Sequence, residues 1–198
     1  MIDDLPPFES TSEQIAALAV VDAKVVSGRR CGSCALCCKV LDIPELQKPS
    51  GEWCKHVTPG HGCARHAERP FACRAFYCEW IVAKGLGPEW KPDKARFVLV
   101  KRGRRLTAHV DRGFPGAWQK TPYYENFKMW AADGARQDPM QRVDVMIGER
   151  LIVVLPDRDV DLGTVAEGGQ VLIERQLGGS LSVRVVSPDA GAPVRASA

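Results

Sequence analysis

The stretch that decides this fold is CGSCALCCKVL, residues 31–41, which places four cysteines within eight positions. On a helical turn, at about 100° per residue, Cys31, Cys34, Cys37 and Cys38 project into an arc of about 120°. The four thiols can therefore face one site. The side chains of adjacent residues diverge, so the Cys37–Cys38 pair indicates two metals, a metal cluster, or one bound and one free thiol.

Four further cysteines follow at separations of sixteen, nine, ten and five residues, namely Cys54, Cys63, Cys73 and Cys78. Eight thiols suffice for two four-cysteine sites, or for a smaller site with some thiols left over. On one helix Cys73 and Cys78 would lie about 140° apart, so we expect them to serve different metals or the helix to break between them. Zinc and iron–sulfur clusters both take cysteine ligands, so spacing does not choose the metal.

Three histidines, His56, His61 and His66, alternate with two of these cysteines in WCKHVTPGHGCARH, residues 53–66. Mixed sulfur and nitrogen ligation therefore stays open, although a histidine in a polar loop is more often simply solvated. The CGSC segment alone is also typical of a thiol–disulfide exchange pair. A helix is expected before it and more cysteines follow at once, which disfavours that interpretation.

Charge is distributed in a way that suits a thiolate-rich site. The chain has 198 residues and a net charge of +3. Residues 29–80 hold eight Lys and Arg against five Asp and Glu, together with all eight cysteines. We expect arginines there to offset thiolate charge, namely Arg29, Arg30, Arg65, Arg69 and Arg74. The excess is too small to favour nucleic-acid binding.

The cysteine pattern resembles a known family. CGSCALCC followed by GCARHAERPFACRAFYC is similar to the YkgJ-like cysteine-cluster proteins, described as zinc- or iron-chelating, with a C-x-x-C-x-x-C-C signature. The likeness covers residues 29–82, about a quarter of the chain. It implies metal binding by the first four cysteines and, more loosely, by the other four. Members often carry an Ile-Tyr pair where Ala64, Arg65 and His66 stand, a difference that concerns packing rather than ligation.

The same family includes flagellin lysine N-methylases, which raises the question of catalysis. Those proteins are larger, and this chain shows no glycine-rich loop after a strand that would serve a methyl donor. The resemblance therefore implies a metal centre more strongly than a reaction, and it names no catalytic residue or substrate.

The expected fold class is α+β, with a cysteine-rich, metal-organised module of short helices followed by an antiparallel β-rich half. We divide the chain into an N-terminal helix in residues 1–28, the module at 29–92, the β-rich region at 93–187 and a flexible tail at 188–198. The first helix is predicted over 10–27, because Ser10 and Glu13 have capping-box spacing. A second helix is predicted from Arg69 to Gly85.

Strand-like patterns begin at residue 95, with glycines 103, 148, 178 and 179 at the expected turns. The predicted strands are 95–102, 105–111, 141–147, 150–156, 170–177 and 181–187. A helix after Pro122 would bury Tyr123, Phe127 and Trp130 on one face. The KRGRR segment, residues 101–105, is predicted to be a solvated hairpin tip rather than a phosphate site. Asp157, Asp159 and Asp161 are predicted to be solvated turn residues rather than calcium ligands.

The cellular setting follows from weaker signals. No apolar run approaches the roughly 18 residues of a membrane helix, and MIDDLPPFES, residues 1–10, lacks the pattern of a secretory signal. We therefore expect a cytoplasmic location, where cysteines serve as metal ligands more often than as disulfides.

The expected function is chelation of zinc or iron, an iron–sulfur cluster included. One alternative is a metal-dependent enzyme related to the methylases, or an iron–sulfur redox protein. The other is a zinc-shaped interaction module for a protein or, less favoured, a nucleic acid. The expected partners are thus a metal ion and a protein, with no membrane.

Overall fold

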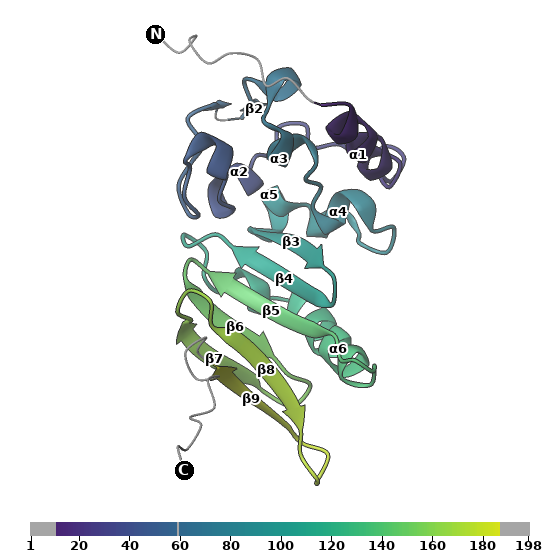
Figure 1. Cartoon of the computed structure of the whole chain (residues 1–198), viewed down its shortest axis with the longest axis vertical. Coiled ribbons are helices and arrows are strands. Elements are labelled where there is room, and N and C mark those ends of the chain that lie inside the picture. The colour runs from purple at the N-terminus through teal and green to yellow at the C-terminus, as the bar shows by residue number, and fades with distance from the viewer. Residues whose placement is uncertain (1–10, 59, 187–198) are drawn as a thin grey trace, which may run out of the picture.

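The structure is a computed structural model that describes residues 11–58 and 60–186. The expected tail at 188–198 and the capping residue Ser10 lie outside the described residues. Helices and sheets are both present, which confirms the α+β class. Figure 1 shows the short helices gathered at one end of the molecule and the strands extending from β3 towards the other end.

The cysteine-rich half contains little regular structure after its first helix. That helix, α1, spans Ser12–Asp22. The later helices are single turns, and two strands form a small hairpin: α2 (Cys37–Val40), η1 (Pro44–Leu46), β1 (Val57–Thr58), β2 (Gly62–Cys63), η2 (His66–Glu68), α3 (Phe71–Arg74), α4 (Glu79–Val82), η3 (Pro88–Trp90) and α5 (Pro92–Ala95).

Both helix predictions in this half need correction. The capping box of α1 joins Thr11 and Gln14, one residue after the predicted pair, and the helix ends at Asp22. The helix predicted from Arg69 to Gly85 is two separate turns, α3 and α4, so the chain breaks between Cys73 and Cys78. The break has a tertiary cause, because Phe76 and Tyr77 pack against the core beside β3 and the Tyr77 hydroxyl donates to Asp22 at 2.7 Å.

A five-stranded sheet forms the second half, in the order β3-β4-β5-β6-β7. Its strands are β3 (Phe97–Arg102), β4 (Arg105–Val110), β5 (Arg142–Ile147), β6 (Arg150–Val154) and β7 (Asp159–Thr164). The sheet is mixed rather than wholly antiparallel, because β4 and β5 pair in parallel. The helix α6 (Tyr123–Ala135) connects these two strands and carries the chain back to the end where β4 begins.

Strand β7 was not predicted. Asp157 is an exposed residue of the bend before this strand, as predicted, whereas Asp159 and Asp161 belong to the strand and make ion pairs, Asp161 while still exposed. Asp159 accepts hydrogen bonds from Tyr124 Oη at 3.0 Å and Lys128 Nζ at 2.7 Å. Asp161 pairs with Arg150 on the neighbouring strand. These partners come from α6 and β6. The strand is therefore stabilised by residues distant in the sequence, which its own pattern of alternating acidic and apolar residues does not identify.

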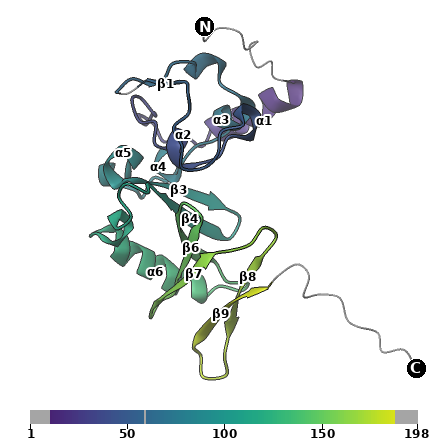
Figure 2. The ribbon, with the colours of Figure 1, turned by 90° about the vertical axis from the view of Figure 1, so that its left-hand side faces the viewer.

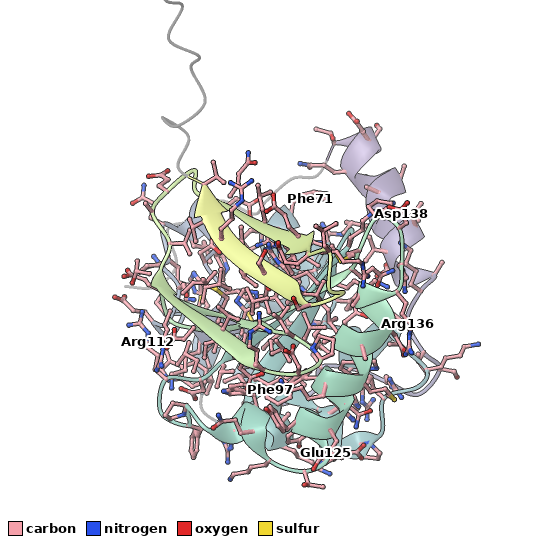
Figure 3. The ribbon with its side chains drawn as sticks, turned by 90° about the horizontal axis from the view of Figure 1, so that it is seen from below. Phe71, Phe97, Arg112, Glu125, Arg136 and Asp138 are labelled. Atoms are coloured by element: carbon pink, nitrogen blue, oxygen red, sulfur yellow. The ribbon has the colours of Figure 1, made fainter. Side chains whose placement is uncertain are left out.

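The two faces of β3 serve different cores. Phe97 and Leu99 pack with Tyr123 and Phe127 of α6, which are buried as the helix pattern predicted, whereas the third predicted residue, Trp130, is only partly buried. Figure 3 shows Glu125 and Arg136 at opposite ends of this helix. Val98 and Val100 face the other way, towards apolar residues of the cysteine-rich half. The sheet therefore supplies one wall for that half.

A separate hairpin, β8 (Gln170–Arg175) and β9 (Leu181–Val186), completes the fold. Its apolar residues pack with Val153 and Leu155 beside the sheet. Figure 2 shows α6 and this hairpin on opposite sides of the sheet. None of the helices in the described part of the chain combines the length and apolar character needed to cross a membrane.

The predicted hairpin tip at residues 101–105 is a turn between β3 and β4, centred on Gly103 with a φ of 56°. Its arginines are exposed. Arg104 donates to the Pro139 carbonyl at 2.6 Å, and Arg105 lies 3.9 Å from the buried Asp144 carboxylate. The exposure of these residues fits the prediction of a solvated tip.

Candidate metal centre

All eight cysteines line one cavity of about 390 Å³, although they span residues 31 to 78. Every one of them is a free thiol. Ile81 and Val98 form part of the apolar wall on the side of the sheet. The volume is many times the roughly 30 Å³ that a water molecule occupies in the liquid, so the cavity has room for more than one ion.

One group of thiols lies against the core beside β3. Cys31, Cys37 and Cys78 pack with the apolar residues of this core, namely Leu36, Val40, Ile81, Val98 and Val100. Cys34 belongs with them, because its backbone N–H donates to the Cys31 carbonyl at 3.0 Å. Backbone amides also reach the sulfur atoms of this group, from Leu36 to Cys34 and from Trp80 and Ile81 to Cys78.

A second group is assembled from the loops that follow. The backbone N–H of Cys54 donates to the Cys38 carbonyl at 3.0 Å, and that of Val57 donates to the Cys54 carbonyl at 3.0 Å. Val57 in turn pairs with Cys63 across the β1–β2 hairpin. Cys73 follows in α3, and the Cys38, Cys54 and Cys63 charges all raise its pKa after the larger effect of burial.

The cavity shifts the pKa values of several of its thiols in opposite directions. Burial raises the pKa of Cys73 to about 12 and that of Cys78 to about 11, so both thiols keep their protons at neutral pH. The Cys37 and Cys38 sulfur atoms lie 3.9 Å apart. A hydrogen bond from the Cys37 thiol lowers the pKa of Cys38 to about 7. A metal that replaces these protons would relieve the cost of burying thiolates.

Cationic side chains surround the cavity, as the sequence predicted, but they are not all the expected ones. Arg65, Arg69 and Arg102 line it, and the Arg69 charge lowers the pKa of Cys38. Arg29 has a different role: its guanidinium donates to the carbonyls of Trp80, Ala83, Lys84 and Leu86, and so connects the motif to α4 and the segment after it.

Lys48 is a cation that the sequence analysis did not single out. Its side chain is 8% exposed, and its Nζ donates to the carbonyls of Lys39, at 3.0 Å, and of Leu41. Its charge also helps to lower the pKa of Cys38. A lysine in a polar loop usually extends into solvent, and no local pattern marks this one as buried.

The structure separates the three histidines. His56 and His66 line the cavity, and His61 lies outside its wall; of the three only His56 is buried. His56 is 6% exposed. Its Nε2 is buried without a hydrogen-bond partner, and so is Arg69 Nε. Burial lowers the pKa of His56, which favours the neutral imidazole that metals bind.

Within residues 11–58 and 60–186, no group of three or more His, Cys, Asp or Glu side chains converges closely enough to hold an ion as it stands. The donors line the wall of the cavity instead of meeting at a point. The donor set nevertheless fits a thiophilic metal, because sulfur predominates and a buried histidine nitrogen lacks a partner.

Comparison with known proteins adds no further support: no family model, curated protein or solved structure matches this chain. The likeness to the YkgJ-like proteins therefore rests on the sequence motifs alone.

Proposed function

We propose that this protein binds zinc or iron through its cysteines and that the metal orders residues 29–92. The observation that carries the proposal is the gathering of all eight thiols around one cavity. The chain segments that contribute them are otherwise connected mainly by single helical turns and a two-residue hairpin. Such an arrangement leaves the sulfur atoms facing a shared space with little regular structure to explain it.

The choice of metal follows from donor chemistry. The acidic residues in the cavity wall are Asp42 and Glu68, against eight thiols. Calcium and magnesium prefer oxygen donors, whereas zinc and iron–sulfur clusters take thiolates. Backbone amides directed at Cys34, Cys63 and Cys78 would stabilise these thiolates once they are deprotonated.

A structural role for the metal follows from the small amount of regular secondary structure in residues 29–92. Because no three donors converge in the described residues, binding requires the sulfur atoms to turn inward from the wall. Loop-borne side chains can do this, and the binding free energy then becomes folding free energy for the module. The chemistry requires reduced thiols, as the cytoplasm would keep them.

The test is elemental analysis of anaerobically purified protein, with an absorption spectrum of the same sample. We expect bound zinc or iron in the wild type and in Ser33→Ala, which alters the motif loop without removing a thiol. The Cys34→Ser variant should hold less. Zinc without colour would support the structural role, and iron with sulfide and a broad brown absorbance would support a cluster with redox chemistry. Protein free of both metals would overturn the proposal.

A further inference from the structure

The eight thiols do not surround the cavity evenly. As described above, Cys31, Cys37 and Cys78 pack against the apolar core beside β3. Cys54 donates its backbone N–H to the Cys38 carbonyl, and Val57, which donates to the Cys54 carbonyl, pairs with Cys63 in the β1–β2 hairpin. The two neighbourhoods contain different segments of the chain and different supporting contacts.

We infer that the cavity holds two separate four-thiol sites, one formed by Cys31, Cys34, Cys37 and Cys78 and the other by Cys38, Cys54, Cys63 and Cys73. The inference rests on the proposed function and adds the number of sites and the membership of each. Each site would take the donor set common to a structural zinc ion and a four-iron cluster.

The boundary between the sites falls within the Cys37–Cys38 pair. Their sulfur atoms are 3.9 Å apart, but their side chains leave the backbone in different directions at the start of α2. Cys37 faces the core beside β3, whereas the carbonyl of Cys38 accepts the Cys54 amide. One residue can therefore serve each site, with the peptide between them joining the two.

The break between α3 and α4 distributes the last two cysteines in the same way. Cys73 lies in α3, whose residue Ala72 donates its N–H to Glu45 at 3.2 Å, and it is not among the cysteines that pack in the core beside β3. Cys78 precedes α4, which packs against β3. A continuous helix would fix the positions of these two sulfur atoms relative to each other. The break between α3 and α4 allows each cysteine to join a different set.

The test measures metal content in variants that remove one thiol or two. Each of Cys34→Ala and Cys73→Ala should retain half of the wild-type metal, whether this is two zinc ions or eight irons with sulfide. Two substitutions within one set, Cys31→Ala with Cys34→Ala or Cys63→Ala with Cys73→Ala, should also retain half. Combining Cys34→Ala with Cys73→Ala should remove the metal. Ser33→Ala should keep the full amount.

A measurement on the unmodified protein covers the case in which a variant fails to fold. Wild-type protein stripped of half its metal by a chelator is alkylated, and its intact mass is recorded. Two separable sites predict a species with four labels, whose peptides carry them on one complete set. Only unlabelled and eight-label species, or a four-label species that mixes the sets, would overturn the inference.

The outcomes also separate the two proposals. Wild-type protein without metal would overturn the proposed function. Metal that is lost completely from every single-cysteine variant, together with the absence of a four-label species, would indicate one shared cluster. That result would overturn the division into two sites and leave metal binding intact.

Discussion

Lys48 shows how a single side chain can hold the loop that completes the candidate metal centre. Its ammonium group is buried beneath the motif and joins two backbone carbonyls, those of Lys39 and Leu41. Burial lowers its pKa, and the charges of Cys38 and Cys54 oppose that effect. Lys48 therefore joins the backbone after the Cys37–Cys38 pair and places a positive charge near Cys38 and Cys54.

Replacing Lys48 by methionine keeps most of the side-chain volume and removes the hydrogen bonds. We expect the free energy of unfolding to fall by about 1–3 kcal/mol, because the Leu41 carbonyl loses its side-chain donor and the Lys39 carbonyl keeps only the Gly51 N–H. The control is Lys55→Met, since Lys55 is exposed. Urea denaturation of the metal-loaded proteins measures the difference. Equal midpoints for the two variants would show that the Lys48 hydrogen bonds contribute nothing to stability.

At the scale of elements, the β1–β2 hairpin must approach the motif loop closely to bring Cys63 to the cavity. Gly62 permits this approach: a Cβ atom there would lie 2.9 Å from the Gly32 carbonyl oxygen, and its φ is +91°. Gly60 has a similar φ of +77° but no neighbour within 4 Å of the corresponding position. Comparing substitutions at the two glycines therefore separates the effect of backbone strain from the effect of a clash with the motif loop.

Both Gly62→Ala and Gly60→Ala should suffer backbone strain of about 1–3 kcal/mol. Gly62→Ala alone must also displace the hairpin from Gly32, so we expect it to retain less metal and to lose a further 1–3 kcal/mol or so of stability. Metal analysis and denaturation of both variants test this. Equal losses in the two variants would mean that the close approach is unimportant.

Strand β4 carries a second element-scale feature, His109. Burial, assisted by the Arg102 and Arg105 charges, lowers its pKa to about 4, while Asp42 opposes the shift. It also lines a small pocket with Lys39, Asp111 and Arg112. In the unfolded state His109 therefore becomes protonated below about pH 6.5, whereas in the folded state it stays neutral down to about pH 4.

Stability should consequently decrease as the pH falls from about 6.5 to 4, by up to about 3 kcal/mol from this residue. The His109→Gln variant should lack that part of the decrease. Denaturation curves across this pH range measure it, and the difference between the two proteins removes any shared effect of metal release at acid pH. Parallel stability profiles for the two proteins would contradict the assignment.

At the scale of the whole molecule, the two halves differ in what holds them together. The sheet and α6 share an extensive apolar core that includes Phe97, Phe127 and Val145, all with 0% exposure. The cysteine-rich half has a smaller core and depends on contacts with β3. We therefore expect the proposed metal to stabilise the cysteine-rich half much more than the half formed by the sheet and α6.

Removing the metal with a chelator should increase amide hydrogen exchange in residues 31–78 and leave strands β4 to β6 almost unchanged. Exchange measured by mass spectrometry on metal-loaded and metal-free protein provides the comparison. Exchange that rises equally in both halves would show that the metal stabilises the whole chain, and unchanged exchange near the cysteines would argue against a structural role.

Several parts of this fold were predictable because their signals are local. Six strands and α6 follow from alternation and helical spacing in short segments, with Gly103 and Gly148 at the turns where positive φ is needed. Strand β7 was not predicted because Asp159 and Asp161 resemble turn residues until their partners on α6 and β6 are known. The parallel β4–β5 pairing depends on how α6 crosses the sheet, which no single segment specifies.

The sequence by itself determined that eight cysteines would be available, in spacings suited to metal ligation, beside a β-rich half. Only the tertiary structure decided which of them are neighbours, that His56 rather than His61 lines the cavity, and that Lys48 is buried. The reason is physical: local periodicity follows from the geometry of short segments, whereas the meeting of thiols dozens of residues apart depends on how the loops pack against β3.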